Sequence, residues 1–418
     1  MKIAFLTFLD VANFGANLQT TSTYNYLKNQ GHEVVAINYS SLKIVFENKL
    51  RKIIRRLRHQ PMPVQDVAHH EYLLSQLDHI SPELHTNRQV AKYILSNKFD
   101  GVIIGSDAVA QHWPVGSTWT IGSFKHRPFW FEPLQQERRF PNPFWGVGFA
   151  DVIPTALLSV SSQNSKYQEF GKKTLSRMAK QLRLMKYLSV RDEWTRQMML
   201  HADTTLKVEL TPDPVFAFNQ NLGSKIPTES EIRTKFNLPQ KYVLIGLKSQ
   251  VYSVEELSKL NELFKKQGKE CVAFSIDGVF NYKHPFAYQL PLPMSPLDWF
   301  ALIKYASAYI GSNMHPIVSA LTNATPCFSI DNWGTVDFWG RKTKEAASSK
   351  VFDVLTQYGI PQYRTEINQG ICDKSVEDIV HLLGSFPINS VKEISKQRTS
   401  MYNSLISHIL NSFTNAIS

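Results

Sequence analysis

One feature constrains the fold more than any other: short apolar runs alternate with helical patterns, twice along the chain. The first set opens with the apolar run Met1–Phe8, a polar loop containing Gly15, a helical pattern ending at Gly31, and a second apolar run at 32–39. Runs of this length that alternate with helices predict parallel strands joined by crossover helices. Because Asp10 interrupts the first run, we interpret that run as a β-strand and not as a signal peptide.

A second set of the same kind begins near residue 241. Its first helix has Ser253 in the N-cap position and ends at Gly268, and a later helix opens with Ser295 and Pro296. The runs predicted as its strands are 241–249, 270–277, 308–312 and 326–331. A chain of 418 residues exceeds what one hydrophobic core usually serves. We therefore predict an α/β protein with two Rossmann-like domains whose parallel sheets face a central cleft.

The division between the domains is predicted from a change in composition. Residues 210–227 are rich in Pro, Asn and Gly and show no helical or strand period, which is typical of a linker. We predict an N-terminal domain at 1–217, with an aromatic-rich insertion at 108–150, and a C-terminal domain at 218–390. The segment 391–418 has a helical pattern and could pack back across the cleft.

The charge balance limits the classes of partner. A net charge of +11 and a pI near 9.3 favour phosphates, anionic lipids or nucleic acid. No nucleic-acid-binding motif occurs, and the GxGxxG and GxxxxGK phosphate loops are absent. The three cysteines form no CxxC pair, which argues against a structural zinc site and fits a reducing compartment. With no apolar run of about 20 residues, we expect a cytoplasmic protein that binds neither a metal nor nucleic acid.

Four polar clusters follow predicted strands, where ligands of open parallel sheets bind. They are Asn13–Gln19, Gly105–Asp107, Ser189–Asp192 and Gly311–His315. Three lie in the first half of the chain and one in the second, so only a cleft between the halves would bring them together. The candidate site is therefore predicted between the two domains.

The cluster around His315 stands where a strand gives way to a helix. The free N–H groups at such a helix start form an anion site, and a histidine there can donate a proton or hold a phosphate. Ser312 and Asn313 could add hydrogen-bond donors. The alternative interpretation is that Ser312 or Asn313 only caps the helix.

Three other residues have both a chemical and a structural interpretation. Asp107 could act as a general base on a sugar hydroxyl, or it could cap a turn. Arg191 could clamp a carboxylate or phosphate, or it could form an ion pair with Asp192 or Glu193. Lys248 ends a predicted strand and could face the cleft, or it could be solvated.

The stretch between Trp113 and Trp145 is rich in aromatic residues interleaved with basic ones. Aromatic faces stack on sugar rings, and loops held by a rigid sheet often carry specificity. We expect one or two of these rings, with Trp113 and Trp130 as candidates, to contact a sugar. The others are expected to form a satellite core.

A basic amphipathic helix is predicted at 43–60. Its apolar members are Ile44, Phe46, Leu50, Ile53, Ile54 and Leu57, and its basic members are Lys49, Arg51, Lys52, Arg55, Arg56 and Arg58. This composition fits a helix lying on an anionic membrane. It also fits an ordinary surface helix whose apolar stripe packs on the protein.

Five sequence segments, taken together and in their order along the chain, form a pattern specific to one protein family. They read NFGANLQTTSTYNYLKNQGHEVVAINY from Asn13, FDGVIIGSD ending at Asp107, SVRDEWT around Arg191, PDPVF at 212–216, and AYIGSNMHPIVSALTNATPCFSID at 308–331. The set resembles the polysaccharide pyruvyl transferase family, with its GSDQVW, SxRD and DP motifs and its (S/T)RLH motif between a strand and a helix. The resemblance covers most of the chain.

This resemblance implies a GT-B-like fold and transfer of a pyruvyl group from phosphoenolpyruvate to paired sugar hydroxyls, giving a cyclic ketal. It implies His315 as acid or phosphate ligand, Asp107 as base and Arg191 as donor clamp. The predicted donor contacts are Ser312, Asn313, Lys248 and Arg191, and the predicted acceptor contacts are Asn13, Asn17, Gln19, Trp113 and Trp130. No cofactor is implied. The acceptor would be a lipid-linked saccharide of cell-surface polysaccharide assembly, used at the inner membrane face.

Two departures from the family pattern bear on the donor. Ala108 and Ala110 stand where the family has Gln and Trp, and Asn313 stands where it has an arginine. Loss of that cation would weaken donor binding by about 1.5–3 kcal/mol, the scale of a hydrogen bond to a charged group. Two other functions therefore stay open: a GT-B-type glycosyltransferase using a nucleotide sugar, and an inactive relative that binds glycan.

Overall fold

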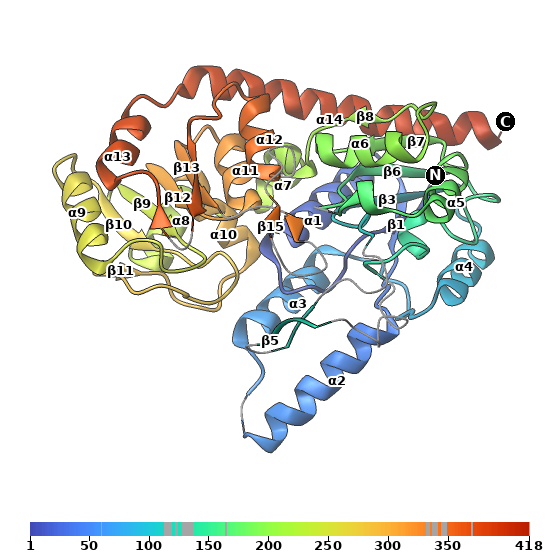
Figure 1. Ribbon diagram of the computed structural model, residues 1–418, viewed down its shortest axis with the longest axis horizontal. Coiled ribbons are helices and arrows are strands. Elements are labelled where there is room, and N and C mark those ends of the chain that lie inside the picture. Colours follow the sequence, from blue (N-terminus) through green and yellow to red (C-terminus); the bar gives the residue numbers. More distant parts are fainter. Residues whose placement is uncertain are drawn as a thin grey trace.

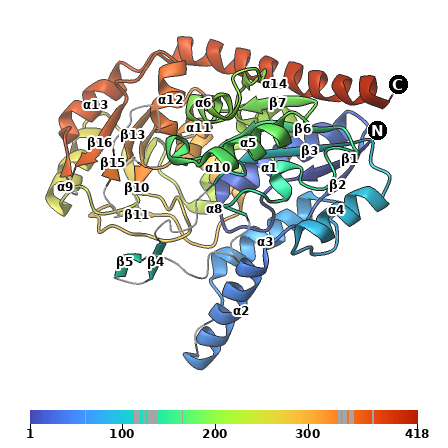
Figure 2. The same ribbon diagram turned by 45° about the vertical axis from the view of Figure 1, so that its right-hand side comes forward.

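A computed structural model gives the architecture of the chain (Figure 1). It describes residues 1–59, 61–112, 119–121, 124–127, 137–163, 165–331, 335–336, 342–343, 349–368 and 371–417. Two parallel sheets lie side by side, each covered by helices, and one long helix runs along both (Figures 1 and 2). The predicted α/β fold with two Rossmann-like halves is confirmed.

The first sheet is parallel throughout and has the order β2-β1-β3-β6-β7-β8. Its strands are β1 (Lys2–Leu6), β2 (Glu33–Ala36), β3 (Gly101–Asp107), β6 (Thr155–Val160), β7 (Tyr187–Val190) and β8 (Glu209–Leu210). The helices of this half are α1 (Phe14–Asn29), α2 (Leu42–Leu57), α3 (Val64–Gln76), α4 (Asn87–Ser96), α5 (Lys172–Leu182) and α6 (Glu193–Ala202). Because helices cover both faces, the central strands read as continuous apolar runs rather than alternating ones.

The second sheet has the order β11-β10-β9-β12-β13-β16-β17, and β17 is antiparallel to its neighbour. Its strands are β9 (Tyr242–Gly246), β10 (Glu270–Ala273), β11 (Tyr288–Gln289), β12 (Ala308–Gly311), β13 (Cys327–Asp331), β16 (Arg364–Asn368) and β17 (Ile371–Cys372). Its helices are α8 (Glu229–Phe236), α9 (Val254–Lys265), α10 (Pro296–Lys304), α11 (Met314–Thr322), α12 (Lys350–Gln357) and α13 (Val376–Gly384). Two short hairpins, β4 (Trp119–Ile121) with β5 (Phe124–Arg127) and β14 (Thr335–Val336) with β15 (Lys342–Thr343), complete the strands described.

The helix starts at Ser253 and Ser295 follow the capping chemistry predicted from the sequence. Ser253 accepts from the N–H of Glu256, whose side chain bonds back to complete a capping box at α9. Ser295 caps α10 with proline in its first turn. Asp192 caps α6 through the N–H of Thr195. These caps satisfy N–H groups that have no partner within the helix.

The final helix, α14 (Ile388–Ile417), joins the two halves (Figure 1). Val391 near its start lies in the core of the C-terminal half. Tyr402 and Phe413 lie in the core of the N-terminal half, and the Tyr402 hydroxyl donates to Thr23 Oγ1 at 3.1 Å. One rigid helix thus contributes side chains to both cores and restrains the halves against separation.

The segment predicted as a linker is packed and helical rather than loose. It forms η4 (Pro214–Ala217), α7 (Phe218–Leu222) and η5 (Gly223–Lys225), and the side chains of Val215, Phe216 and Phe218 lie in the core of the C-terminal half. The carbonyl of Pro214 accepts a hydrogen bond from Ser22 of α1 at 2.7 Å. The absence of a sequence period reflects three consecutive short helical turns, each too short to show one.

The aromatic-rich insertion is described only in part. Phe140, Phe144 and Trp145 are buried in the core of the N-terminal half, and the last two belong to η2 (Pro143–Trp145). These three rings are core residues, as the satellite-core interpretation expects. Trp113 and Trp130, the two candidates for sugar contact, lie outside the described residues.

Helix α2 contradicts the interpretation that its apolar stripe packs on the protein. None of its sixteen residues, all of which the structure describes, is buried, and Phe46 is 63% and Leu57 77% exposed. The helix projects from the body of the molecule (Figures 1 and 2). Among the residues described, no helix has the length and apolarity needed to cross a bilayer. The spacing of apolar residues predicts an amphipathic helix, but it does not show which face of that helix packs against the protein.

A candidate active site between the two sheets

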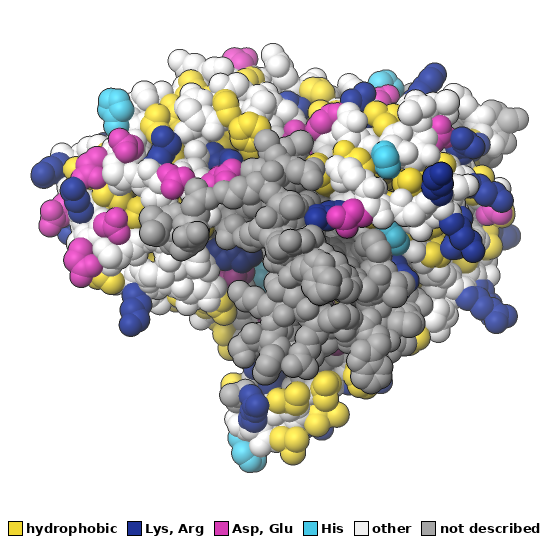
Figure 3. All heavy atoms as spheres, viewed as in Figure 1, with side chains coloured by type: hydrophobic (Ala, Val, Ile, Leu, Met, Phe, Trp, Pro, Cys, Tyr) yellow, Lys and Arg dark blue, Asp and Glu magenta, His cyan; other side chains and the backbone are white. Residues whose placement is uncertain are grey.

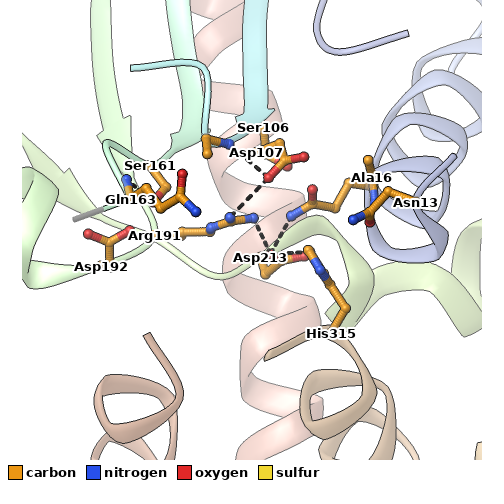
Figure 4. A network of polar contacts seen from close by, with 12 residues as sticks. Asn13, Ala16, Ser106, Asp107, Ser161, Gln163, Arg191, Asp192, Asp213 and His315 are labelled. Atoms are coloured by element: carbon orange, nitrogen blue, oxygen red, sulfur yellow. Dashed lines mark hydrogen bonds and ion pairs between the residues drawn. The ribbon is translucent and has the colours of Figure 1, made fainter. Parts of the chain in front are cut away.

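The three predicted catalytic residues come together where the two halves meet. Asp107 ends β3, Arg191 follows β7, and His315 lies in the first turn of α11 on the opposite half. In Figure 4 the side chains of Arg191 and His315 point toward Asp213, which stands directly before η4, and Asp107 contacts Arg191. The network therefore draws on both sheets and on the segment that connects them.

Asp213 is the centre of this network. Its Oδ2 accepts from Arg191 Nη1 at 2.9 Å and from the side-chain amide of Gln19 on α1. The same oxygen lies 4.0 Å from His315 Nε2. Its Oδ1 accepts from the N–H of Val215 at 3.0 Å, so the first turn of η4 fixes the carboxylate. One carboxylate thus connects α1, β7 and α11.

Arg191 joins two carboxylates and not the two acidic residues next to it in sequence. Its Nη2 lies 3.2 Å from Asp107 Oδ1, opposite the bond to Asp213, and its side chain is only 3% exposed. Asp192 is occupied as the cap of α6, and Glu193 pairs with Arg196. The predicted alternative of a local ion pair is therefore wrong. Burial opposes the charge, but the two carboxylates outweigh it and raise the pKa of Arg191, so the guanidinium stays cationic.

Asp107 adopts a backbone conformation that side chains rarely take, with φ of 76°. Its Oδ1 accepts from the N–H of Ala108 at 2.7 Å as well as from Arg191, whereas Oδ2 accepts no hydrogen bond within the described part of the chain. Burial would raise the pKa of this carboxyl, but the charges of Arg191, His315 and Lys350 outweigh burial and lower it. Asp107 is therefore an ionised carboxylate with one oxygen available.

His315 is held as a neutral imidazole. Burial is the main cause that lowers its pKa to about 4, and the nearby cations Arg191 and Lys350 act in the same direction against Asp213 and Asp107. Its buried Nε2 has no hydrogen-bond partner within the described residues. A buried polar atom without a partner costs free energy, and such atoms are often explained by an absent ligand or by catalysis.

The four residues form two tiers. The side chains of Asp107 and His315 are each 17% exposed, whereas those of Arg191 and Asp213 are 3% and 2% exposed. The partly open residues can meet a substrate, and the closed pair holds them in place.

Gly15 on α1 fixes the position of the His315 ring. A Cβ added at Gly15 would lie 2.0 Å from His315 Cγ, closer than any real contact. Next to it, Phe14 stacks on Trp299 of α10 with ring centroids 5.0 Å apart, so α1 cannot easily retreat. The glycine is required here for close approach between the two halves.

Replacing Gly15 by Ala should displace the imidazole and reduce turnover by about a hundredfold, the cost of a 1 Å misplacement at a catalytic group. Gly223→Ala is the matched control, because nothing lies within 4 Å of a Cβ added there. Turnover and circular dichroism of both variants would check this. Equal activity of the two variants would show that the ring position does not matter.

The residues before α11 do not cap it with their side chains. Asn313 occupies the N-cap position with φ of 73°, but its side chain makes no capping hydrogen bond. Ser312 Oγ instead accepts from the N–H of Lys248 at 3.3 Å. The capping interpretation is therefore wrong for both. The Lys248 residue is exposed.

The three polar candidates on or before α1 lie in different environments. Gln19 joins the network through Asp213. Asn17 points to His69, with Nδ2 2.7 Å from Nδ1 of that ring, and is not part of the network. Asn13 caps α1 by accepting from the N–H of Ala16 at 3.0 Å, and its exposed side chain lies beside the network in Figure 4.

Sequence reasoning missed two residues. Asp213 lies in the PDPVF segment, whose resemblance to a family motif was the available signal for a role. Lys350, at the start of α12, lines a narrow pocket together with Arg191, Asp213 and Met314. Burial, followed by the charge of Arg191, lowers the pKa of Lys350 to about 8. No local pattern marks this lysine, since only the fold brings it to the site.

Solved structures show the same fold at low sequence identity. The MnaA protein of S. aureus, solved with UDP, has a TM-score of 0.51 and 9% identity, covering 99% of this chain and 97% of its own. UDP-N-acetylglucosamine 2-epimerase from Rickettsia bellii has a TM-score of 0.50 and 10% identity, with coverage of 99% and 97%. This likeness concerns the fold alone and confirms the GT-B-like arrangement.

At the level of sequence, no curated protein matches the chain. The family model for polysaccharide pyruvyl transferase matches residues 13–334. That range contains Asp107, Arg191, Asp213 and His315, and it includes α1 and α11, which meet at the site. The chain therefore belongs to the polysaccharide pyruvyl transferase family.

Proposed function

We propose that the chain transfers a pyruvyl group from phosphoenolpyruvate to two hydroxyls of a saccharide, releasing phosphate and leaving a cyclic ketal. The observation that carries this proposal is the pairing of two partly open titratable residues, Asp107 and His315, held by the buried pair Arg191 and Asp213. Enol chemistry of this kind requires one group that delivers a proton and one that accepts a proton, within a single site.

The proposed reaction balances as follows. A proton adds to the methylene carbon of the donor, and the central carbon becomes an oxocarbenium-like centre. One sugar hydroxyl adds to that carbon and loses its proton to a base. The second hydroxyl then displaces phosphate from the same carbon. Of the two hydroxyl protons, one replaces the proton used at the methylene and the other leaves with phosphate.

His315 can deliver a proton only after phosphoenolpyruvate is bound. The neutral imidazole has a pKa of about 4 in the free protein, mainly because of burial. A phosphate or carboxylate brought next to the ring favours the charged form and raises its pKa. Donor binding would therefore load the acid with a proton. Asp107, already ionised with Oδ2 available, would accept the proton of the attacking hydroxyl.

Lys350 supplies a donor cation that the family pattern places elsewhere. Asn313 stands where the family has an arginine, and Arg191 is already paired with two carboxylates. Lys350 lies beside Arg191 in the same pocket, and a lysine is a strong partner for a phosphate. The N–H groups that open α11 would add donors for the same anion. Ser312 and Asn313 remain proposed contacts at that helix start.

On the acceptor side, the proposed contacts are Asn13, Gln19 and the aromatic insertion, with Trp113 and Trp130 as predicted. Asn17 is not proposed as an acceptor contact, because its side-chain amide is hydrogen-bonded to His69. The acceptor proposed is a lipid-linked saccharide used at the inner membrane face. The donor itself is a substrate, so the proposal includes no cofactor.

Release of phosphate from phosphoenolpyruvate tests the reaction. Full-length protein would be incubated with phosphoenolpyruvate and a glycan library, and phosphate and product masses would be measured. Acceptor-dependent phosphate release with mass gain on a glycan is the expected result. Nucleotide release from a sugar nucleotide, with no turnover of phosphoenolpyruvate, would identify a glycosyltransferase. Glycan binding without turnover of either donor would identify an inactive relative.

A further inference from the structure

Helix α2 carries an apolar face that no described part of the protein covers. Phe46, Ile53 and Leu57 are 63%, 54% and 77% exposed, and Leu42 and Leu50 are 45% exposed each. Residues spaced by three or four positions lie on one side of a helix, so these five form one stripe. Exposed apolar side chains gather on the projecting part of the molecule in Figure 3. Contiguous exposed apolar surface of this kind marks an interaction site.

The helix is oriented opposite to a normal surface helix. The side of α2 that faces the body lines a groove against α3 through Ile44, Asn48, Arg51, Lys52 and Arg55. Apart from Ile44, these are polar or cationic side chains. A helix that only covered a core would turn its apolar stripe inward. Here the stripe faces outward, and the polar side faces the protein.

Helix α2 is strongly basic, and only part of its basic residues face the groove. Among positions 42–59, Arg51, Lys52 and Arg55 line this groove, Lys43, Lys49, Arg56 and Arg58 do not, and Glu47 is the only acidic residue. Lys43 pairs with Glu47 at 3.5 Å, so the helix has a strongly positive margin. Two copies of α2 placed face to face would bring these cations together. The charge therefore favours an anionic partner over a second copy of this chain.

We infer that α2 docks on an anionic lipid bilayer. Its apolar stripe enters the boundary between headgroups and acyl chains, and the basic residues outside the groove, Lys49, Arg56 and Arg58, contact headgroup phosphates. This goes beyond the proposed reaction, because binding to a bilayer requires no turnover.

Docking in this way would give the catalytic cleft a defined position. A second groove at the root of α2, which shares Ile44 and Asn48 with the first, is lined by Leu9 and Val11 after β1 and by Tyr39 and Ser40 after β2. These loops stand at the carboxyl edge of the sheet that also carries Asp107. A protein anchored through α2 would therefore present this edge toward lipid-borne molecules.

Vesicle sedimentation of the full-length protein tests the inference. We expect binding to vesicles of phosphatidylcholine mixed with phosphatidylglycerol, little binding to phosphatidylcholine alone, and release as salt rises. Arg56→Gln with Arg58→Gln should lower partitioning about 30-fold, since each basic residue near the surface contributes about fivefold. Phe46→Ser with Ile53→Ser should lower it at least about tenfold. Arg55 is left unchanged because it donates to the carbonyl of Pro61.

Matched controls distinguish the contribution of α2 from that of surface charge or exposed apolar side chains elsewhere on the protein. Lys172→Gln with Lys173→Gln removes the same charge from exposed positions of α5, and Val152→Ser removes an apolar side chain that is 67% exposed. Both controls should bind as the native chain does. The inference is overturned if the native chain ignores anionic vesicles, if the α2 variants bind equally well, or if the controls lose as much. A native dimer that becomes monomeric in Phe46→Ser with Ile53→Ser would assign the face to a second copy instead.

Discussion

Replacing His315 by Ala should lower acceptor-dependent phosphate release by about a hundred- to ten-thousandfold, the usual contribution of a general acid. The ring is partly open to the cleft, and its Nε2 has no hydrogen-bond partner in the described protein. Because nothing in that part of the chain depends on a bond to Nε2, the fold should survive the change. Circular dichroism and denaturant unfolding would verify the fold, and a phosphate assay would measure the loss.

The matched control is His381→Ala, an exposed histidine on α13 far from the network in sequence and fold. It should retain native activity. His315→Gln adds a second variant that keeps a polar side chain of similar length but cannot deliver a proton as imidazolium. Native turnover in either His315 variant would remove this residue from the mechanism.

The lowered pKa of His315 also predicts that binding of phosphoenolpyruvate takes up a proton. Because the folded pKa is about 4 and the ordinary value is 6.5, the ring is neutral at pH 7 before the donor binds. If the anionic donor raises that pKa, binding takes up a proton from the buffer. Calorimetric titration with phosphoenolpyruvate in buffers of different ionisation enthalpy would measure the uptake. The uptake should disappear in His315→Ala, whereas a merely structural ring would give none in either protein.

The same shift affects stability in a defined direction. Between about pH 4 and pH 6.5 the unfolded state binds more protons at this ring than the folded state does. This contribution to stability is therefore full above that window and is lost as the pH falls through it. The His315→Ala variant should lose less stability than the native chain over the same interval.

The sequence predicted the sheets well because buried parallel strands leave a simple signal. Strands such as β3 and β9 are covered on both faces, so they read as apolar runs with sharp ends. Ligands of such sheets bind at strand ends, and the sequence alone places Asp107, Arg191 and His315 there. A helix start was also visible at α11 because it follows such a strand at once.

Other features depend on contacts that no local pattern contains. Asp213 lies 22 positions after Arg191, and it reaches the guanidinium only because the connecting segment folds into short helices. Lys350 arrives from a helix far along the chain. For α2, the period defined a stripe, but the direction of that stripe depends on how the helix leaves the body. Asn17 and Gln19 are two positions apart on α1, so their side chains point about 200 degrees apart, and only Gln19 reaches Asp213 whereas Asn17 contacts His69.

Replacing Arg191 by Gln should lower the free energy of unfolding by about 3–5 kcal/mol, because it leaves buried carboxylates without their shared cation. Asp107 and Asp213 both contact this guanidinium, and the Asp213 side chain is only 2% exposed. Arg183→Gln is the matched control. Its ion pair with Asp203 is closer, at 2.7 Å, but the arginine is 62% exposed, and Asp203 also accepts hydrogen bonds from the N–H and hydroxyl of Thr205. Loss of an arginine that is mostly in solvent, with the carboxylate still hydrogen-bonded, should cost much less than loss of Arg191. Denaturant unfolding of both variants would compare them.

The pH dependence of that loss identifies its cause. In the native chain Arg191 helps to hold the pKa of Asp107 below its ordinary value, so this contribution to stability is present at neutral pH and is lost as the pH falls through the folded pKa. Burial is already the largest single influence on Asp107, and without the arginine it should outweigh the remaining charges and raise that pKa. Protonation of Asp107 would then remove its buried charge. The stability difference between the variant and the native chain should therefore shrink as the pH falls. Adding Asp213→Asn, which removes one buried charge, should restore part of the stability at neutral pH. A deficit that is constant with pH, or no larger than that of Arg183→Gln, would mean that Arg191 acts by packing and not by charge.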